Sequence, residues 1–237
     1  MANEMKFKIF CVGAGGTGGY FLKEFSRFLG GPNKLIRSLN VIDGDIVEEH
    51  NLQRQAFQEE DIGQYKASVL AEVLNDTFCL DWRAFPMFLT SVEQIDDILS
   101  LKTDEIPILL GCVDNHGCRL VLEEYFRTHD NCIYFDSANE IQSGEVVLSY
   151  KLNGKQVSPL RSEIFPDILK GDTRNVTEMS CEELNTVTPQ HITVNMMAGL
   201  ALLSSVVGLI QNQRVRPGMI CFNSFDMSSE YIPLGGE

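Results

Sequence analysis

The chain has 237 residues, of which 44% are hydrophobic and 22% are charged, and its net charge is −14. This length suits one hydrophobic core, so we expect a single domain over residues 1–237. The acidic charge disfavours binding to nucleic acid, which depends on clustered Lys and Arg that neutralise phosphates. The seven cysteines show no paired spacing and no signal peptide is visible, which predicts reduced thiols in a cytoplasmic protein.

The first 152 residues alternate expected strands with expected helices. Residues 7–13 form an apolar run that breaks into glycines, and helical periodicity follows over 20–29. The later expected elements are a strand at 39–43, a helix at 63–74, a strand at 106–113, a helix at 119–127, a strand at 132–135 and a hairpin arm at 141–152. This alternation predicts an α/β fold with a doubly wound, mostly parallel, Rossmann-like sheet.

The last part of the chain is less regular. We expect a long irregular crossover segment over residues 153–187, an apolar helix over 192–210 and a final strand over 219–225. The apolar helix is long enough to span a membrane, but Asn195 interrupts it and no Lys/Arg cluster flanks it. We therefore interpret it as a helix buried in the core or in a dimer interface, and we expect no membrane association.

A glycine-rich turn is the first motif that indicates a ligand. Its four glycines follow the first strand and open the first helix, at Gly13, Gly15, Gly16 and Gly18. Glycines here let backbone N–H groups approach phosphate oxygens, and the helix N-terminus favours an anion. Asp43 ends the second strand, where a carboxylate can accept hydrogen bonds from ribose hydroxyls. These residues predict an adenosine nucleotide, but the same turn serves NAD, FAD, S-adenosylmethionine and ATP.

Two cations and side-chain amides beyond Asp43 favour ATP. Arg54 and Lys66, together with Asn51 and Gln55, follow the ribose acid in the sequence. Attack on the α-phosphate of a triphosphate needs cations on the leaving pyrophosphate and on the charge of the transition state. Arg54 can act as a bidentate fork and Lys66 as a point charge.

Acidic residues near the same strand ends suggest a metal ligand. Asp114 and Asn115 follow the strand at 106–113, and Asp114 is the expected Mg²⁺ ligand. Because ligands in doubly wound sheets bind at the carboxyl ends of strands, Gly13, Asp43 and Asp114 should converge in one crevice. Asp45 could assist the metal or the ribose, or it could serve only in the turn after Gly44.

Four motifs, in this order, resemble the ThiF/MoeB/ubiquitin-activating superfamily. They are VGAGGTGG, VIDGDIVEEHNLQRQAF, DIGQYKA and CVDNHGCR, and they lie between about residues 8 and 150. Later segments, namely FPDIL, SCEEL, PQHITVN and FNSFDMSSEYIPL, are similar to the ThiF-family component of the plasmid-associated PRTRC system. The second resemblance extends the match to nearly the whole chain.

The resemblance implies a single ThiF-type adenylation domain, with a nucleotide-binding core at 1–152 and the crossover segment, helix and strand at 153–237. It assigns Asp43 to the ribose, the set Asn51, Arg54, Gln55 and Lys66 to the phosphates, and Asp114 to Mg²⁺ and the α-phosphate. The implied reaction is ATP-dependent adenylation of the C-terminal glycine carboxylate of a small ubiquitin-like or sulfur-carrier-like protein. Such enzymes are usually dimers.

The chain departs from this family in two respects. The paired CxxC motifs that hold zinc in many relatives are absent, so we expect no zinc. The N-terminal arm that lends an Arg to a neighbouring active site is also absent, so Arg27 or Arg37 replaces it or the ATP site is weaker. Cys181 lies where some relatives carry the activated protein on a cysteine, although it could be an ordinary loop residue.

Two other functions fit parts of the sequence. A nucleotide-binding scaffold or regulatory subunit would have the same fold without its own catalysis, but it would not need Arg54, Lys66 and Asp114 together. An NAD-dependent oxidoreductase would share the glycine turn, but it would not depend on Lys66. We therefore expect an adenylyltransferase in which these three residues, and Cys181 if a thioester forms, carry the chemistry.

Overall fold

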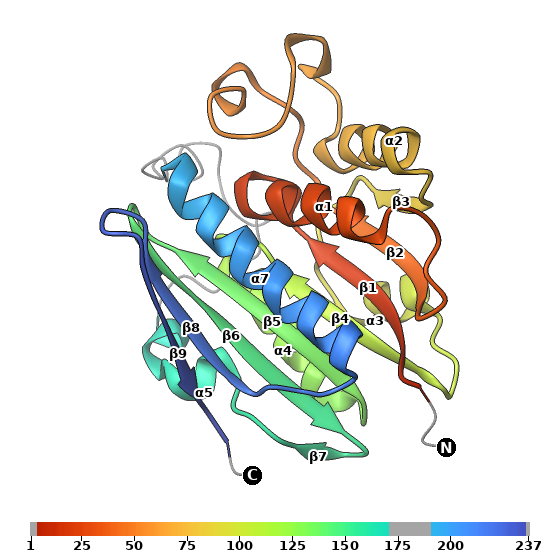
Figure 1. The fold of residues 1–237 in the computed structure, drawn as a ribbon, viewed down its shortest axis with the longest axis vertical. Helices are drawn as coiled ribbons and strands as arrows, with labels where there is room; N and C mark the ends of the chain where they lie inside the picture. The colour runs from red at the N-terminus through yellow and green to blue at the C-terminus, as the bar shows by residue number, and fades with distance from the viewer. Residues whose placement is uncertain (1–3, 171–190, 236–237) are drawn as a thin grey trace.

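The computed structural model describes residues 4–170 and 191–235, in which nine strands form one sheet. Its order is β3-β2-β1-β4-β5-β6-β8-β9, with β7 paired to β6 (Figure 1). The strands are β1 (Lys6–Val12), β2 (Ile36–Ile42), β3 (Trp82–Phe85), β4 (Glu105–Gly111), β5 (Cys132–Asn139), β6 (Ser143–Leu152), β7 (Lys155–Gln156), β8 (Gly218–Asn223) and β9 (Ser228–Pro233). The sheet continues across residue 152, because β6 pairs with β8.

The sheet has a parallel part and an antiparallel part. Adjacent strands from β3 through β2, β1 and β4 to β5 are parallel, whereas the pairs β5–β6, β6–β8 and β8–β9 are antiparallel. The parallel strands are linked through helices, as a right-handed crossover requires, and β6 returns from β5 as a hairpin. The expected α/β fold with a mostly parallel sheet is therefore confirmed.

Helices cover both faces of the sheet. The helices are α1 (Gly16–Leu29), α2 (Lys66–Phe78), α3 (Val92–Leu99), α4 (His116–Thr128), α5 (Arg161–Ile164) and α7 (Ile192–Asn212), with short 3₁₀ turns η1 (Glu49–Asn51), η2 (Glu59–Asp61) and η3 (Pro166–Lys170). Figure 1 shows α2, α1 and α7 side by side on one face, with α3 and α4 behind the sheet. The glycine turn and the start of α7 lie at the same end of this layer.

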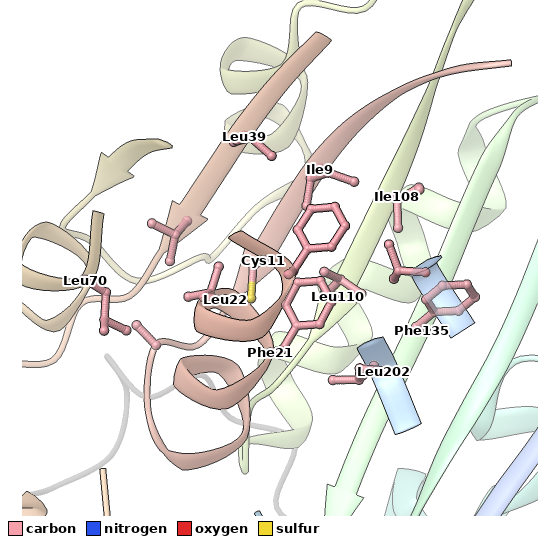
Figure 2. Packing of buried hydrophobic residues seen from close by; sticks show 14 of the residues in the cluster. Ile9, Cys11, Phe21, Leu22, Leu39, Leu70, Ile108, Leu110, Phe135 and Leu202 are labelled. Atoms are coloured by element: carbon pink, nitrogen blue, oxygen red, sulfur yellow. The ribbon is translucent and has the colours of Figure 1, made fainter. Parts of the chain in front are cut away.

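The larger of the two apolar clusters lies between the sheet and the layer formed by α1, α2 and α7. Figure 2 shows Phe21 and Leu22 of α1 pointing toward Cys11 of β1 and Leu110 of β4. Leu202 of α7 lies near the same layer and is fully buried. Since a buried Leu or Phe contributes about 2 kcal/mol, this packing holds the start of α1, and hence the glycine turn, against the strand ends.

Helix α7 is the only helix among the described residues that is long and apolar enough to cross a membrane by length and composition. In the structure it lies along α1 and over β5 and β6 (Figure 1). Val194, Ala198 and Leu202 are buried on its inner side, while Met196 and Leu200 are exposed on the other. The expected core helix is therefore confirmed for one face of α7.

Several expected boundaries were wrong. The helix expected over 63–74 begins only at Lys66. Gly63 lies in a turn with a φ of +86°, which is not helical, and its backbone N–H donates to the carbonyl of Val47. The short elements β3 and α3 were missed, although Trp82 of β3 is buried in the core. Strand β8 ends at Asn223, and a turn then leads to the unexpected edge strand β9.

Candidate functional site

A cleft of about 1310 Å³ lies at the carboxyl ends of β1, β2 and β4. The strand ends are joined there by hydrogen bonds from Gly13 N to the carbonyl of Ile42 (2.9 Å) and from Cys112 N to that of Val12 (2.8 Å). The cleft brings together nearly all of the site residues expected from the sequence, namely Gly13, Gly15, Gly16, Asp43, Asp45, Asn51, Arg54, Gln55, Lys66, Asp114 and Asn115. Their roles in binding and catalysis stay predictions.

The glycine turn needs glycine for reasons of space. Gly13 has a φ of +94°, and a Cβ there would lie 2.4 Å from the carbonyl oxygen of Cys112. Gly18 does not line the cleft, and a Cβ there would lie 1.9 Å from the carbonyl oxygen of Gly13. Both glycines therefore allow the start of α1 to lie close to the ends of β1 and β4. This brings the free N–H groups of the first helical turn to the cleft.

Asp43 stands at the end of β2 and is partly buried. Its carboxylate accepts hydrogen bonds from Ala14 N (2.6 Å) and from Asp45 N (2.8 Å). Loss of water on burial, and then the charge of Asp45, raise its pKa to about 6, against the lowering effect of the Ala14 N–H and of Lys66. Asp43 thus fixes the glycine turn while its proton is held unusually tightly for a carboxyl group.

Lys66 begins α2 and is 7% exposed. Its Nζ lies 3.0 Å from the Oδ2 of Asp45, whose side chain is half exposed. The backbone holds the same pair together, because Lys66 N donates to the carbonyl of Asp45 (2.9 Å). In the structure Asp45 therefore pairs with the Lys66 ammonium. The backbone N–H of Asp45 also donates to the Asp43 carboxylate in the turn that follows β2.

Arg54 and Asp114 are the charged groups of the cleft that are available to a ligand. Neither side chain makes a hydrogen bond or ion pair within the described part of the chain, and Asp114 is exposed. No cluster of three or more His, Cys, Asp or Glu side chains among the described residues could hold a metal. A single free carboxylate nevertheless fits Mg²⁺, which commonly uses one or two carboxylates together with phosphate oxygens.

Two of the three amide side chains expected at the site form hydrogen bonds that hold the loops of the cleft. Asn51 is buried, and its Oδ1 accepts a hydrogen bond from Glu48 N (3.0 Å). Asn115 caps α4 by accepting from Cys118 N (2.9 Å). The Oε1 of Gln55 is buried and has no hydrogen-bond partner among the described residues. Gln55 therefore has an unused acceptor at the cleft, whereas the oxygens of Asn51 and Asn115 hold the loops that carry Arg54 and Asp114.

A buried ionic network beside Asp114 was missed by the sequence analysis. Asp136 of β5 pairs with Arg119 of α4 (Nε to Oδ1, 3.0 Å) and with Arg161 of α5, which also pairs with Glu145 of β6. Arg119 further donates to the carbonyl of Ser137 (2.7 Å). Both arginines line the cleft and are almost fully buried, so the network joins α4, β5, β6 and α5 along one wall.

Polar residues at the end of β5 and the start of α7 were also missed. Ser137, Asn139 and Asn195 line the cleft on the side away from Lys66, and the Ser137 hydroxyl is buried without a hydrogen-bond partner. The available signal was Asn195 itself, a polar residue inside an apolar run. An amide at such a position must find a polar partner in the fold.

Two other expected residues, Arg27 and Arg37, lie away from the cleft. Arg27 is in the last turn of α1 and pairs with Glu24, and Arg37 lines a separate cavity at the other end of the sheet. Neither arginine lines the cleft of its own chain, because the end of α1 and the start of β2 lie at the amino ends of the parallel strands. Cys181 lies outside the described residues.

The known proteins that are similar to this chain include activating enzymes for ubiquitin and for NEDD8. Ubiquitin-activating enzyme E1 1 of Arabidopsis thaliana is 29% identical over 162 residues, covering 67% of this chain and 14% of that enzyme. The NEDD8-activating enzyme E1 catalytic subunit of Saccharomyces cerevisiae is 36% identical over 75 residues, covering 31% of this chain and 23% of that subunit. The chain thus spans only a small part of these relatives.

Among solved structures, Escherichia coli MccB with AMPCPP and selenomethionine MccA is similar at a TM-score of 0.68 and 16% identity. The match covers 97% of this chain and 64% of MccB, and another MccB structure contains ATP. At this identity the likeness supports the fold alone. The sequence profile of the ThiF family matches residues 4–236, nearly the whole chain, and the protein therefore belongs to the ThiF family.

Proposed function

We propose that this chain is an ATP-dependent adenylyltransferase that activates the C-terminal carboxylate of a small ubiquitin-like or sulfur-carrier-like protein and releases pyrophosphate. The observation that carries the proposal is that one cleft holds the glycine turn together with Arg54, Lys66 and Asp114. A dinucleotide needs only the turn and the ribose acid. The two cations and the free carboxylate suit a triphosphate with a bound metal.

In this proposal the nucleotide lies across the ends of β1, β2 and β4. Asp43 accepts hydrogen bonds from the ribose, and the N–H groups at the start of α1 bind phosphate oxygens. The side chain of Arg54 has no partner among the described residues to give up, and its guanidinium binds the leaving phosphates through two parallel hydrogen bonds. Lys66 exchanges its contact with Asp45 for phosphate oxygens, so that Asp45 keeps the ammonium in place before ATP arrives.

The reaction joins a carboxylate oxygen of the acceptor to the α-phosphorus and breaks the bond between the α-phosphorus and the pyrophosphate oxygen. The products are an acyl adenylate and pyrophosphate. Arg54 and Lys66 stabilise the charge that grows on the leaving group. Asp114 would hold Mg²⁺ jointly with phosphate oxygens, and the metal would supply further neutralisation of their charge.

The names of the relatives support the class of acceptor. Two of them are activating enzymes for ubiquitin or NEDD8, and MccB was crystallised with MccA. We therefore propose an acceptor that is a small protein with a C-terminal glycine. The closer resemblance to the PRTRC component stays a prediction. So does the single domain over residues 1–237, with its nucleotide-binding core ending at residue 152. The absence of zinc, of nucleic-acid binding and of membrane association is likewise a prediction.

Exchange of radioactive pyrophosphate into ATP tests the activity. The purified protein, Mg-ATP and a ubiquitin-like protein ending in glycine should show exchange that is lost when the terminal glycine of the acceptor is deleted. The Lys66→Ala variant should bind the same nucleotide but lose exchange, whereas Lys23→Ala, at an exposed position on α1, should keep it. If wild-type protein binds ATP but never exchanges pyrophosphate with such acceptors, the scaffold alternative replaces this proposal.

We also propose that the protein is a cytoplasmic homodimer. Leu200 is 64% exposed and Met196 is 45% exposed on the outer face of α7, and a partner subunit would bury both. Light scattering coupled to size exclusion should give about twice the mass of one chain. The double variant Met196→Ser with Leu200→Ser should give one chain mass, and a monomeric wild-type protein would contradict the proposal.

A further inference from the structure

Asn195 occupies the space beside the glycine turn that a side chain at position 16 would fill. It lies in the first turn of α7, is 3% exposed and lines the cleft. A Cβ built on Gly16 would lie 2.3 Å from the Nδ2 of Asn195, which therefore points to the first residue of α1. The amide nitrogen is thus beside the N–H groups that receive oxyanions at the helix start.

The orientation of this amide follows from its oxygen. The Oδ1 of Asn195 accepts a hydrogen bond from Asn139 Nδ2 (3.2 Å) and lies 3.5 Å from the hydroxyl of Thr17. Asn139 also donates to Thr17 Oγ1 (2.8 Å). Turning the Asn195 amide over would bring two NH₂ groups together, so the network fixes Nδ2 toward the turn. No hydrogen bond in the described part of the chain uses that nitrogen.

Within the described residues this donor has no protein partner, although its side chain is more than nine-tenths buried, so water or a ligand in the cleft must accept its hydrogen bond. An unmade hydrogen bond of this kind costs about 1–3 kcal/mol. Nearby, the buried hydroxyl of Ser137 also lacks a partner. Ser137 and Asn139 share the face of β5 that α1 and α7 cover, because Phe135 belongs to the apolar cluster on that face and residues alternate along a strand. Two unused polar groups therefore lie on this side of the cleft.

The side of the cleft identifies the ligand. The proposed phosphate-binding residues Arg54 and Lys66 come from the segment that leads into α2, on one side of α1. Helix α7 lies on the other side of α1 (Figure 1). In an in-line displacement the attacking oxygen enters opposite the leaving group. If the pyrophosphate departs toward Arg54 and Lys66, the acceptor carboxylate enters from the side of Asn195.

We propose that Asn195 binds the acceptor carboxylate through its Nδ2, which donates to the oxygen that becomes the carbonyl oxygen of the acyl adenylate. This inference rests on the proposed adenylyltransferase function. The ligand class is a peptide C-terminal carboxylate, whose oxygens are acceptors for this amide donor. Asn139 holds Asn195 in this orientation, so it acts as a positioning residue.

The test uses two stable ligands that differ only in the acyl group. The first is 5′-O-sulfamoyladenosine, and the second carries N-acetylglycine on the sulfamoyl nitrogen and mimics the adenylate of a glycine terminus. Calorimetric titration of the full-length protein should show tighter binding of the acylated ligand. Asn195→Ala should weaken its binding about tenfold, the effect of one lost hydrogen bond, and leave the simple sulfamoyladenosine unchanged.

Two further variants separate binding from folding. Asn195→Asp keeps the oxygen that accepts from Asn139 but replaces the donor by an acceptor, so it should weaken the acylated ligand by more than Asn195→Ala does. Asn212→Ala removes an exposed amide from the other end of the same helix and should change neither affinity. Thermal melting of each variant confirms that the fold is intact.

The remaining outcomes overturn the inference in distinguishable ways. Equal weakening of both ligands in Asn195→Ala would place the amide on the nucleotide rather than on the acceptor. Unchanged affinity for both ligands would mean that Asn195 only supports the fold. If the wild-type protein binds sulfamoyladenosine but gains nothing from the acyl group, the inference fails and the nucleotide site stands. If it binds neither ligand, the proposed function fails as well.

Discussion

The affinity of the cleft for adenosine should fall in weak acid, because the carboxyl that would hold the ribose is protonated there. Loss of water on burial, and then the charge of Asp45, raise the pKa of Asp43 to about 6. Ribose hydroxyls donate most strongly to the ionised carboxylate, so protonation of Asp43 weakens these hydrogen bonds. With a pKa of about 6, roughly a tenth of the molecules are ionised at about pH 5, and affinity should fall about tenfold between about pH 7 and about pH 5.

Calorimetric titration with adenosine measures this effect without interference from phosphate groups, which titrate in the same range. The matched control ligand is 2′,3′-dideoxyadenosine, which lacks both ribose hydroxyls and should bind with little dependence on pH. Circular dichroism at each pH shows whether the fold persists. Equal affinity for adenosine at about pH 7 and about pH 5 in folded protein, or the same pH dependence for both ligands, would refute the role given to Asp43.

The same pKa shift affects stability in the opposite sense. The folded pKa of Asp43 lies above the value of 3.8 for an unperturbed carboxyl, so the folded state binds the proton more tightly than the unfolded state does. The contribution of Asp43 to the free energy of unfolding is therefore fully present below about pH 4 and is lost as the pH rises through about 6, by up to about 3 kcal/mol. The free energy of unfolding, measured in urea at several pH values, should fall more steeply with rising pH in the wild type than in Asp43→Ala. Equal pH dependence in the two proteins would contradict the raised pKa of Asp43.

Three other substitutions test separate parts of the cleft. Lys66→Ala should lower the adenylation rate by about two to three decades in pyrophosphate exchange, while nucleotide affinity changes less, and a mild effect would mean that the triphosphate lies elsewhere. Arg161→Ala should cost about 3 kcal/mol in urea unfolding because it leaves Asp136 with one cation, and a loss below about 1 kcal/mol would show that the network is not needed for the fold. Ser137→Ala should not lower the melting temperature, because its hydroxyl has no partner to lose, and a clear loss would reveal one.

The parallel part of the fold follows from local sequence signals. An apolar run that breaks into glycines predicts a strand, a tight turn and a helix, and the structure has β1, the turn at Gly13 and α1 in that order. Asp43 and Asp114 could be brought together from sequence because both follow buried parallel strands, whose carboxyl ends share one edge of a sheet. The prediction succeeded where periodicity and strand direction alone determine the geometry.

Contacts between distant segments could not be predicted in this way. Asp136 pairs with Arg119 and Arg161, which lie 17 and 25 residues away, and the pairing depends on how α4 and α5 pack behind β5. Strand β3 has four residues, too few for alternation to be distinguished from a loop. Strand β9 has exposed residues along most of its length, so it carries no apolar pattern.

Asn195 shows why an exception to a pattern can be more informative than the pattern. Apart from Thr193 and Asn195, the first part of α7 is apolar, and the length and hydrophobicity of the helix alone are compatible with a membrane span. A buried amide in such a helix is unfavourable unless it is hydrogen-bonded, and here only its oxygen is bonded to protein. The free nitrogen faces the glycine turn, where replacing Gly16 by any larger residue would displace it. The two positions are therefore coupled: Gly16→Ala should weaken the acylated ligand in the wild-type background, but it should have little further effect on that ligand in Asn195→Ala.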